Sequence, residues 1–114
     1  MVRSTPTQAA LLRIYTEEAR RLDGRPLYEA LVLKARAAKI AGATVLRGPM
    51  GYGHSARLHN ANILDLSTNL PLVIEMVDAE DKLRAFAAAL DGIDNIALVT
   101  LEKVEVLTGG PAKP

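Results

Sequence analysis

The chain has 114 residues, a length typical of one domain, and its 14 basic and 13 acidic residues leave a formal net charge of +1. This balance argues against a general nucleic-acid binder, and the absence of cysteine excludes disulfides, thiol catalysis and cysteine-bound zinc. Because the N-terminus has no signal-peptide pattern and no apolar run approaches about 18 residues, we expect a cytoplasmic protein that does not span a membrane.

The first half of the chain predicts a strand, a helix and a second strand. Residues 1–8 read as a flexible tail, and the apolar run Ala9 to Thr16 predicts a strand. The turn signal Asp23-Gly24 follows, and Pro26 suits the first turn of a helix. The helix has one apolar face, with Gly42 as its expected C-terminal cap, and Ala43 to Leu46 begins the second strand. The residues of that face are Leu27, Ala30, Leu31, Ala35 and Ala38.

The second half repeats the pattern. After a polar segment, Ile63 to Leu66 predicts a short strand and Leu70 to Val77 a longer one, with Pro71 at its start. We expect Asp78 to be the N-cap of a second helix that ends at Asp91-Gly92. The apolar stripe of this helix comprises Ala79, Leu83, Phe86 and Leu90. Ile96 to Leu107 predicts the last strand, and residues 109–114 read as a second tail.

The order β-α-β-β-α-β predicts an α+β protein, a ferredoxin-like domain over residues 9–108 with two helices on one face of an antiparallel four-stranded sheet. Side chains alternate along a strand, and both faces of the predicted strands are largely apolar. An uncovered apolar face of this size is unusual in a monomer, so we expect an oligomer that packs sheet faces together. Arg13 and Glu75 share that second face, where they either pair or lie solvated at a sheet end.

The segment Arg47 to His54 is the strongest candidate for a functional site. Gly48, Gly51 and Gly53 fall within six positions after the second strand, and glycine permits positive φ or close approach of the backbone to another group. The pattern is neither of the two nucleotide-binding glycine fingerprints. It is compatible with an anion-binding loop flanked by Arg47 and His54, with Tyr52 inside it, or with a plain connection.

Other candidate chemistry is weaker. His54 and His59 could contribute to a metal site, but nothing in their spacing requires one. Glu17 and Glu18 read as solvated carboxylates. Arg20, Arg21 and Arg25 read as surface charge, with contact to an anion or a partner as the alternative. No serine lies in a nucleophile motif, so we expect no enzymatic activity.

The element order and the glycine-rich segment together resemble the PII-like signalling superfamily, and within it a short bacterial branch. The matching segments are residues 23–30, 41–53, 70–75 and 99–104, and the likeness covers roughly residues 9 to 107. It implies a homotrimer of ferredoxin-like subunits with a T-loop between the second and third strands. It also implies that an adenine nucleotide binds between subunits and that the loop docks on a transporter, an enzyme or a regulator.

The chain departs from the nucleotide-binding members of that superfamily in two places. Where they carry a phosphate loop rich in glycine and lysine, Asp91 to Asn95 holds two acids and no lysine. Near the C-terminus only Lys113 stands where arginines are usual. These departures argue against ATP, so we expect a regulatory protein that senses a small anionic ligand, with a nucleotide as one candidate. A metal-binding trimer resembling copper-tolerance proteins is the alternative.

Overall fold

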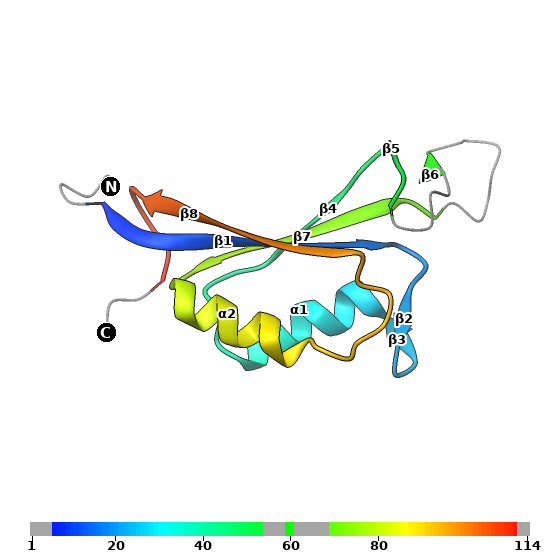
Figure 1. The fold of residues 1–114 in the computed structure, drawn as a ribbon, viewed down its shortest axis with the longest axis horizontal. Helices are drawn as coiled ribbons and strands as arrows, with labels where there is room; N and C mark the ends of the chain where they lie inside the picture. Colours follow the sequence, from blue (N-terminus) through cyan, green and yellow to red (C-terminus); the bar gives the residue numbers. More distant parts are fainter. Residues whose placement is uncertain (1–5, 54–58, 61–68, 112–114) are drawn as a thin grey trace.

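The computed structural model describes residues 6–53, 59–60 and 69–111. Four strands form one sheet: β1 (Thr7–Glu17), β4 (Thr44–Arg47), β7 (Pro71–Asp78) and β8 (Leu98–Val106). Their order is β4-β7-β1-β8, and every neighbouring pair is antiparallel. Helices α1 (Leu27–Ala37) and α2 (Glu80–Ala89) both lie against one face of this sheet (Figure 1). The predicted ferredoxin-like fold is confirmed.

Two short hairpins extend from this framework. In the first, β2 (Arg21–Leu22) pairs with β3 (Arg25–Pro26) through Asp23 and Gly24, whose φ angles of 51° and 82° suit a tight two-residue hairpin turn. In the second, β5 (Met50–Gly51) pairs with β6 (His59–Asn60) beyond the end of the sheet, on the side away from the helices (Figure 1). The short strand predicted at residues 63–66 falls outside the described residues.

The hydrophobic core lies between the sheet and the two helices. Every second residue of β1 from Ala10 to Thr16, and of β7 from Leu72 to Asp78, faces the helices and is buried, as the predicted alternation requires. The core is aliphatic apart from Phe86, because α1 and α2 contribute mainly leucine and alanine side chains. Its central members are Ala10, Leu12, Ile14, Leu27, Leu31, Ala35, Ile74, Met76, Leu83 and Phe86.

The predicted end of the first helix is wrong. Helix α1 ends at Ala37 with Ala38 as its C-cap, so Ala38 is exposed and Gly42 plays no capping role. Lys39 takes the left-handed conformation instead, with φ 61°. The amides of Lys39 and Ile40 donate to the carbonyls of Arg36 and Ala35, 3.0 Å away in both cases, which is the Schellman arrangement. Burial of Ile40 against the core stabilises this turn.

The predicted start of the second helix is also wrong. Asp78 is the last residue of β7, and Ala79 is the N-cap and exposed, so it does not join the apolar stripe of α2. Leu83, Phe86 and Leu90 are buried as expected. The Asp78 carboxylate is 2% exposed and accepts hydrogen bonds from the amides of Ala79 (2.7 Å) and Ala41 (2.9 Å). The Asp78 side chain therefore ties the connection before β4 and the start of α2 to the end of β7.

Candidate functional site

The face of the sheet opposite the helices, which we call the open face, is covered by no element of the described chain (Figure 1). Its side chains form rows across the strands. One row is apolar and runs through Leu46, Val73, Tyr15 and Leu98. Leu46 and Leu98 are 47% and 53% exposed, although large apolar side chains are normally buried. The open face thus leaves large apolar side chains exposed to solvent.

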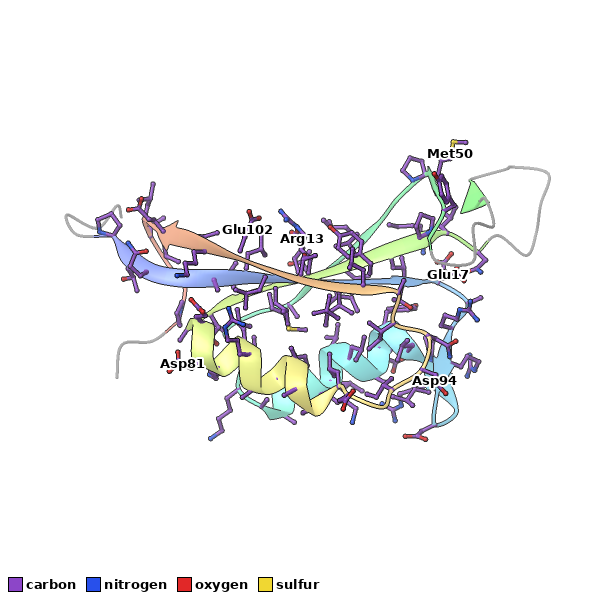
Figure 2. The ribbon with its side chains drawn as sticks, in the orientation of Figure 1. Arg13, Glu17, Met50, Asp81, Asp94 and Glu102 are labelled. Carbon is purple, nitrogen blue, oxygen red and sulfur yellow. The ribbon has the colours of Figure 1, made fainter. Side chains whose placement is uncertain are left out.

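The next row of the open face is polar and centres on Arg13. Its Nε lies 2.9 Å from an oxygen of Glu75, and its Nη1 lies 2.8 Å from an oxygen of Glu102 (Figure 2). The pairing of Arg13 with Glu75, one of the two predicted alternatives, is confirmed. The hydrogen bond from Arg13 to Glu75 and the charge of Glu102 raise the pKa of Arg13 above its usual value, although desolvation acts in the opposite direction. Two carboxylates therefore share one guanidinium in a polar row that lies next to the apolar row of the open face.

A cavity of about 510 Å³ lies at one end of the sheet, where β1 finishes and β7 begins. This volume is within the range of small-molecule sites. Of the residues that the structure describes, two tyrosines and several aliphatic side chains line it, together with one arginine, one carboxylate, a threonine and an asparagine. The lining residues are Tyr15, Thr16, Glu17, Arg20, Tyr52, Gly53, Pro71, Leu72, Val73, Asn95, Ile96 and Ala97.

The segment between α2 and β8 forms one wall of this cavity. Thr16 Oγ1 donates to the carbonyl of Asn95 over 2.8 Å, and the amide of Ala97 donates to the carbonyl of Tyr15 over 2.9 Å. The ladder between β1 and β8 begins with the pair Tyr15 and Leu98, so β8 starts at Leu98 and the predicted start at Ile96 is two residues early. Asp91 and Asp94 are exposed and outside the lining. The two acids of the predicted acidic loop therefore do not line this cavity.

The predicted site residues divide into two groups. Tyr52 and Gly53 line the cavity. Arg47, Gly48 and Gly51 do not, and His54 lies outside the described residues. Arg47 ends β4, and its Nη2 forms an ion pair with Glu18. The structure thus places some of the described candidates at the cavity and the others beside it.

Close approach to Pro71 explains two of the three glycines in this segment. A Cβ at Gly48 would lie 3.2 Å from Cγ of Pro71, and a Cβ at Gly51 would lie 3.3 Å from the same atom. The amide of Gly48 donates to the carbonyl of Pro71 over 2.8 Å. None of Gly48, Gly51 and Gly53 has a positive φ. These glycines therefore let the β4–β5 connection pack on the start of β7, and the Gly48 amide is already bonded within the chain.

Several residues that line the cavity carry no recognisable signal in the sequence. The sequence favours solvated charges at Glu17 and Arg20, yet both lie on the cavity and form an ion pair, with Arg20 Nε 3.1 Å from Glu17 Oε2. It places Tyr15 only on the second face of the sheet. No short motif marks these positions, because they meet only when β1, β7 and the segment after α2 come together.

The metal-site hypothesis concerns side chains that are not described. His54 lies outside the described residues, and His59 is placed only as the backbone partner of Gly51 in the β5–β6 pair. Within residues 6–53, 59–60 and 69–111 no three histidine, aspartate or glutamate side chains gather as metal ligands would. Neither helix of the described chain has the length and apolar character to cross a bilayer.

The fold is that of PII-like proteins. CPII from Thiomonas intermedia K12, whose structure holds ADP and bicarbonate, superposes with a TM-score of 0.70 at 15% identity, over 91% of this chain and 93% of CPII. A PII-like protein of Thermus thermophilus gives a TM-score of 0.65 at 16% identity, over 90% of this chain and 92% of that one. The resemblance to the PII-like superfamily is confirmed at the level of the fold.

The sequence assigns the family. Residues 9–106 match the model of DUF190, described as an uncharacterized ACR, and the chain belongs to this family. A UPF0166 protein of Aquifex aeolicus is 38% identical over 97 residues, which are 85% of this chain and 91% of the relative. A UPF0166 protein of Methanocaldococcus jannaschii is 32% identical over 103 residues, which are 90% of this chain and 94% of the relative.

Proposed function

We propose that this protein is a non-enzymatic PII-like regulator that binds a small anionic ligand of the adenine nucleotide class in the cavity beside Tyr52 and acts on a partner protein through the loop between β4 and β7. The observation that carries the proposal is the cavity itself, which meets the base of that loop at Tyr52 and Gly53. CPII, which has the same fold, binds ADP and bicarbonate.

The chemistry of the lining suits a planar ring that carries a negative charge. Tyr15 and Tyr52 offer aromatic surface to a base, and stacking of a base on an aromatic side chain contributes about 1–3 kcal/mol. Among the described residues, Arg20 supplies the guanidinium of the lining, which can hold a phosphate by charge-assisted hydrogen bonds. The lining thus offers an aromatic part for the base and a cationic part for the phosphate.

We further propose that the functional unit is a homotrimer in which the open faces pack together, as the PII-like resemblance implies. Tyr15 and Val73 belong both to the apolar row of the open face and to the wall of the cavity. A neighbouring copy on the open face would therefore complete the cavity, and the ligand would lie between subunits.

Calorimetric titration with ADP tests the ligand proposal. We expect wild-type protein to bind ADP, and Arg20→Gln to weaken binding by about tenfold, because a hydrogen bond to a charged group contributes roughly 1.5–3 kcal/mol. Arg21→Gln is the matched control, since Arg21 bonds the carbonyl of Gly24 within the hairpin and is absent from the lining. Failure of the wild type to bind ADP, or equal losses in the two variants, would contradict the proposal.

A further inference from the structure

Residues Glu17 to Arg20, which we call the anchor segment, connect β1 to the β2–β3 hairpin. Glu17 and Arg20, at the two ends of the anchor segment, both line the cavity (Figure 2 labels Glu17). Between them, Glu18 and Ala19 do not line it. A ligand that moves Glu17 or Arg20 therefore acts on residues that are bonded directly to Glu18 and Ala19 along the chain.

The anchor segment also contacts both ends of the loop between β4 and β7. At the start of the loop, Glu18 pairs with Arg47. At its end, the amide of Ala19 donates to Oδ1 of Asn69 over 2.8 Å, and the amide of Glu18 donates to the carbonyl of Leu70 over 2.8 Å. The residues that lead into β7 are thus fixed by the anchor segment, whose two end residues line the cavity.

The Glu17 carboxylate links the cavity to the end of the loop. Its Oε2 accepts from Nε of Arg20 and from Nδ2 of Asn69, at 3.1 Å in both cases. The Glu17 side chain is only 17% exposed, so water screens its charge less than at the surface. The position of Asn69 therefore depends on a carboxylate whose charge is balanced by a guanidinium on the cavity wall.

We infer that an anionic ligand in the cavity releases Asn69 from the anchor segment by competing with Glu17 for Arg20. This regulation rests on the proposed function. The anionic group of the ligand takes the guanidinium, and the Glu17 carboxylate is left beside a second negative charge. Like charges in a partly buried site repel, so the carboxylate turns away and the side chain of Asn69 loses its acceptor. Binding of the ligand thus frees the side chain of Asn69 at the end of the loop between β4 and β7.

The exchange rate of the Ala19 amide with solvent reports this release, because that amide is bonded to the Asn69 side chain. NMR exchange measurements would compare free protein with protein saturated by ADP, with saturation verified by calorimetry. We expect ADP to speed exchange at Ala19 by about fivefold, the loss of one ordinary hydrogen bond. The amide of Ile40, bonded to the carbonyl of Ala35 in α1, serves as the internal control and stays unchanged.

Variants of the neighbouring residues Glu17 and Glu18 show whether the charge of Glu17 or the pair between Glu18 and Arg47 causes the response to ADP. In Glu17→Gln the side chain carries no charge for ADP to repel, so the faster exchange at Ala19 disappears at an ADP concentration that saturates this variant by calorimetry. In Glu18→Gln, which removes the pair with Arg47 and leaves the cavity lining intact, the response to ADP persists.

Each outcome has a defined meaning. If ADP binds and the Ala19 rate does not change, or if Glu17→Gln responds like the wild type, the inference is overturned and the proposed function stands. If ADP does not bind the wild type, the proposed function and this inference both fall.

Discussion

At the end of β7, Asp78 connects three parts of the fold through one buried carboxylate. It accepts hydrogen bonds from the amides of Ala79 and Ala41 and lies 3.3 Å from Nζ of Lys82. Burial by itself would raise the pKa of Asp78, but the two amides and the Lys82 ammonium outweigh it and lower the pKa. The charged carboxylate is therefore the form that the folded state stabilises.

Replacement of Asp78 by asparagine leaves an amide group where an acceptor is needed, so we expect Asp78→Asn to lower the free energy of unfolding at pH 7 by about 1–3 kcal/mol. The lowered pKa means that the contribution of Asp78 is complete above the unfolded-state pKa, about 3.9, and is lost as pH falls through the folded-state pKa. Urea titrations at pH 7 and pH 3, at one protein concentration, measure both effects.

The control for this prediction is Asp81→Asn in the first turn of α2, where the aspartate is exposed (Figure 2). It should change stability by a few tenths of a kcal/mol. An equal cost of Asp78→Asn at pH 7 and pH 3 would show that charge on Asp78 is not the cause.

Arg13 offers a second prediction for a single residue. Arg13→Met leaves Glu75 and Glu102 near each other without their shared cation on the open face. If that face is an interface between copies, like charges in it oppose assembly, and the variant should associate more weakly in analytical ultracentrifugation. Adding Glu75→Gln and Glu102→Gln to the same chain should restore association. No rescue would mean that the two carboxylates are not what opposes assembly.

Among the elements, the connection from β4 to β5 depends on two glycines that pack on Pro71. We expect the double variant Gly48→Ala and Gly51→Ala to destabilise the protein by about 1–2 kcal/mol, because each new Cβ crowds the proline ring. Gly42→Ala is the control, since a Cβ there meets nothing within 4 Å, and it should be neutral or slightly stabilising. Thermal unfolding measures both, and a double variant as stable as Gly42→Ala would contradict the packing account.

The four strands of the main sheet and the two helices could be predicted from the sequence, because the spacing of apolar residues depends on the local structure and not on how the elements pack. The short strands β2, β3, β5 and β6 were not predicted. Alternation in β1 and β7 and the three- and four-residue spacing in α1 match the buried positions. The helix ends could not be predicted in this way. Lys39 takes the left-handed turn that Gly42 suggested, because burial of Ile40 offsets the strain, and Asp78 is held in β7 by an amide from a distant connection.

The cavity could be predicted only in part, because its lining residues come from separate elements of the chain. Tyr52 and Gly53 lie in a recognisable glycine-rich segment, so sequence alone pointed to them. Arg20 and Glu17 look like any other surface charges, and their place on the cavity depends on how the end of β1 meets β7. A site assembled from several strand ends leaves no contiguous pattern in the chain.

At the scale of the whole molecule, the exposed apolar row of the open face predicts that the protein assembles through this face. We expect the wild type to sediment as a trimer and Leu46→Glu to dissociate, because the new charge falls in the apolar row. Leu33→Glu is a matched control on the other side of the molecule, since Leu33 is 39% exposed on α1 and Leu46 is 47% exposed on β4. A monomeric wild type, or equal dissociation of the two variants, would remove the open face as an interface.

The most direct test of the ligand-sensing account is a map of backbone amide chemical shifts on addition of ADP. We expect the largest changes on amides around the cavity, at Gly53, Ile96 and Ala97, and no change at the amide of Ile40, which follows the end of α1 and is absent from the lining. Saturable binding with shifts confined to another surface, or no shifts at millimolar ADP, would contradict it.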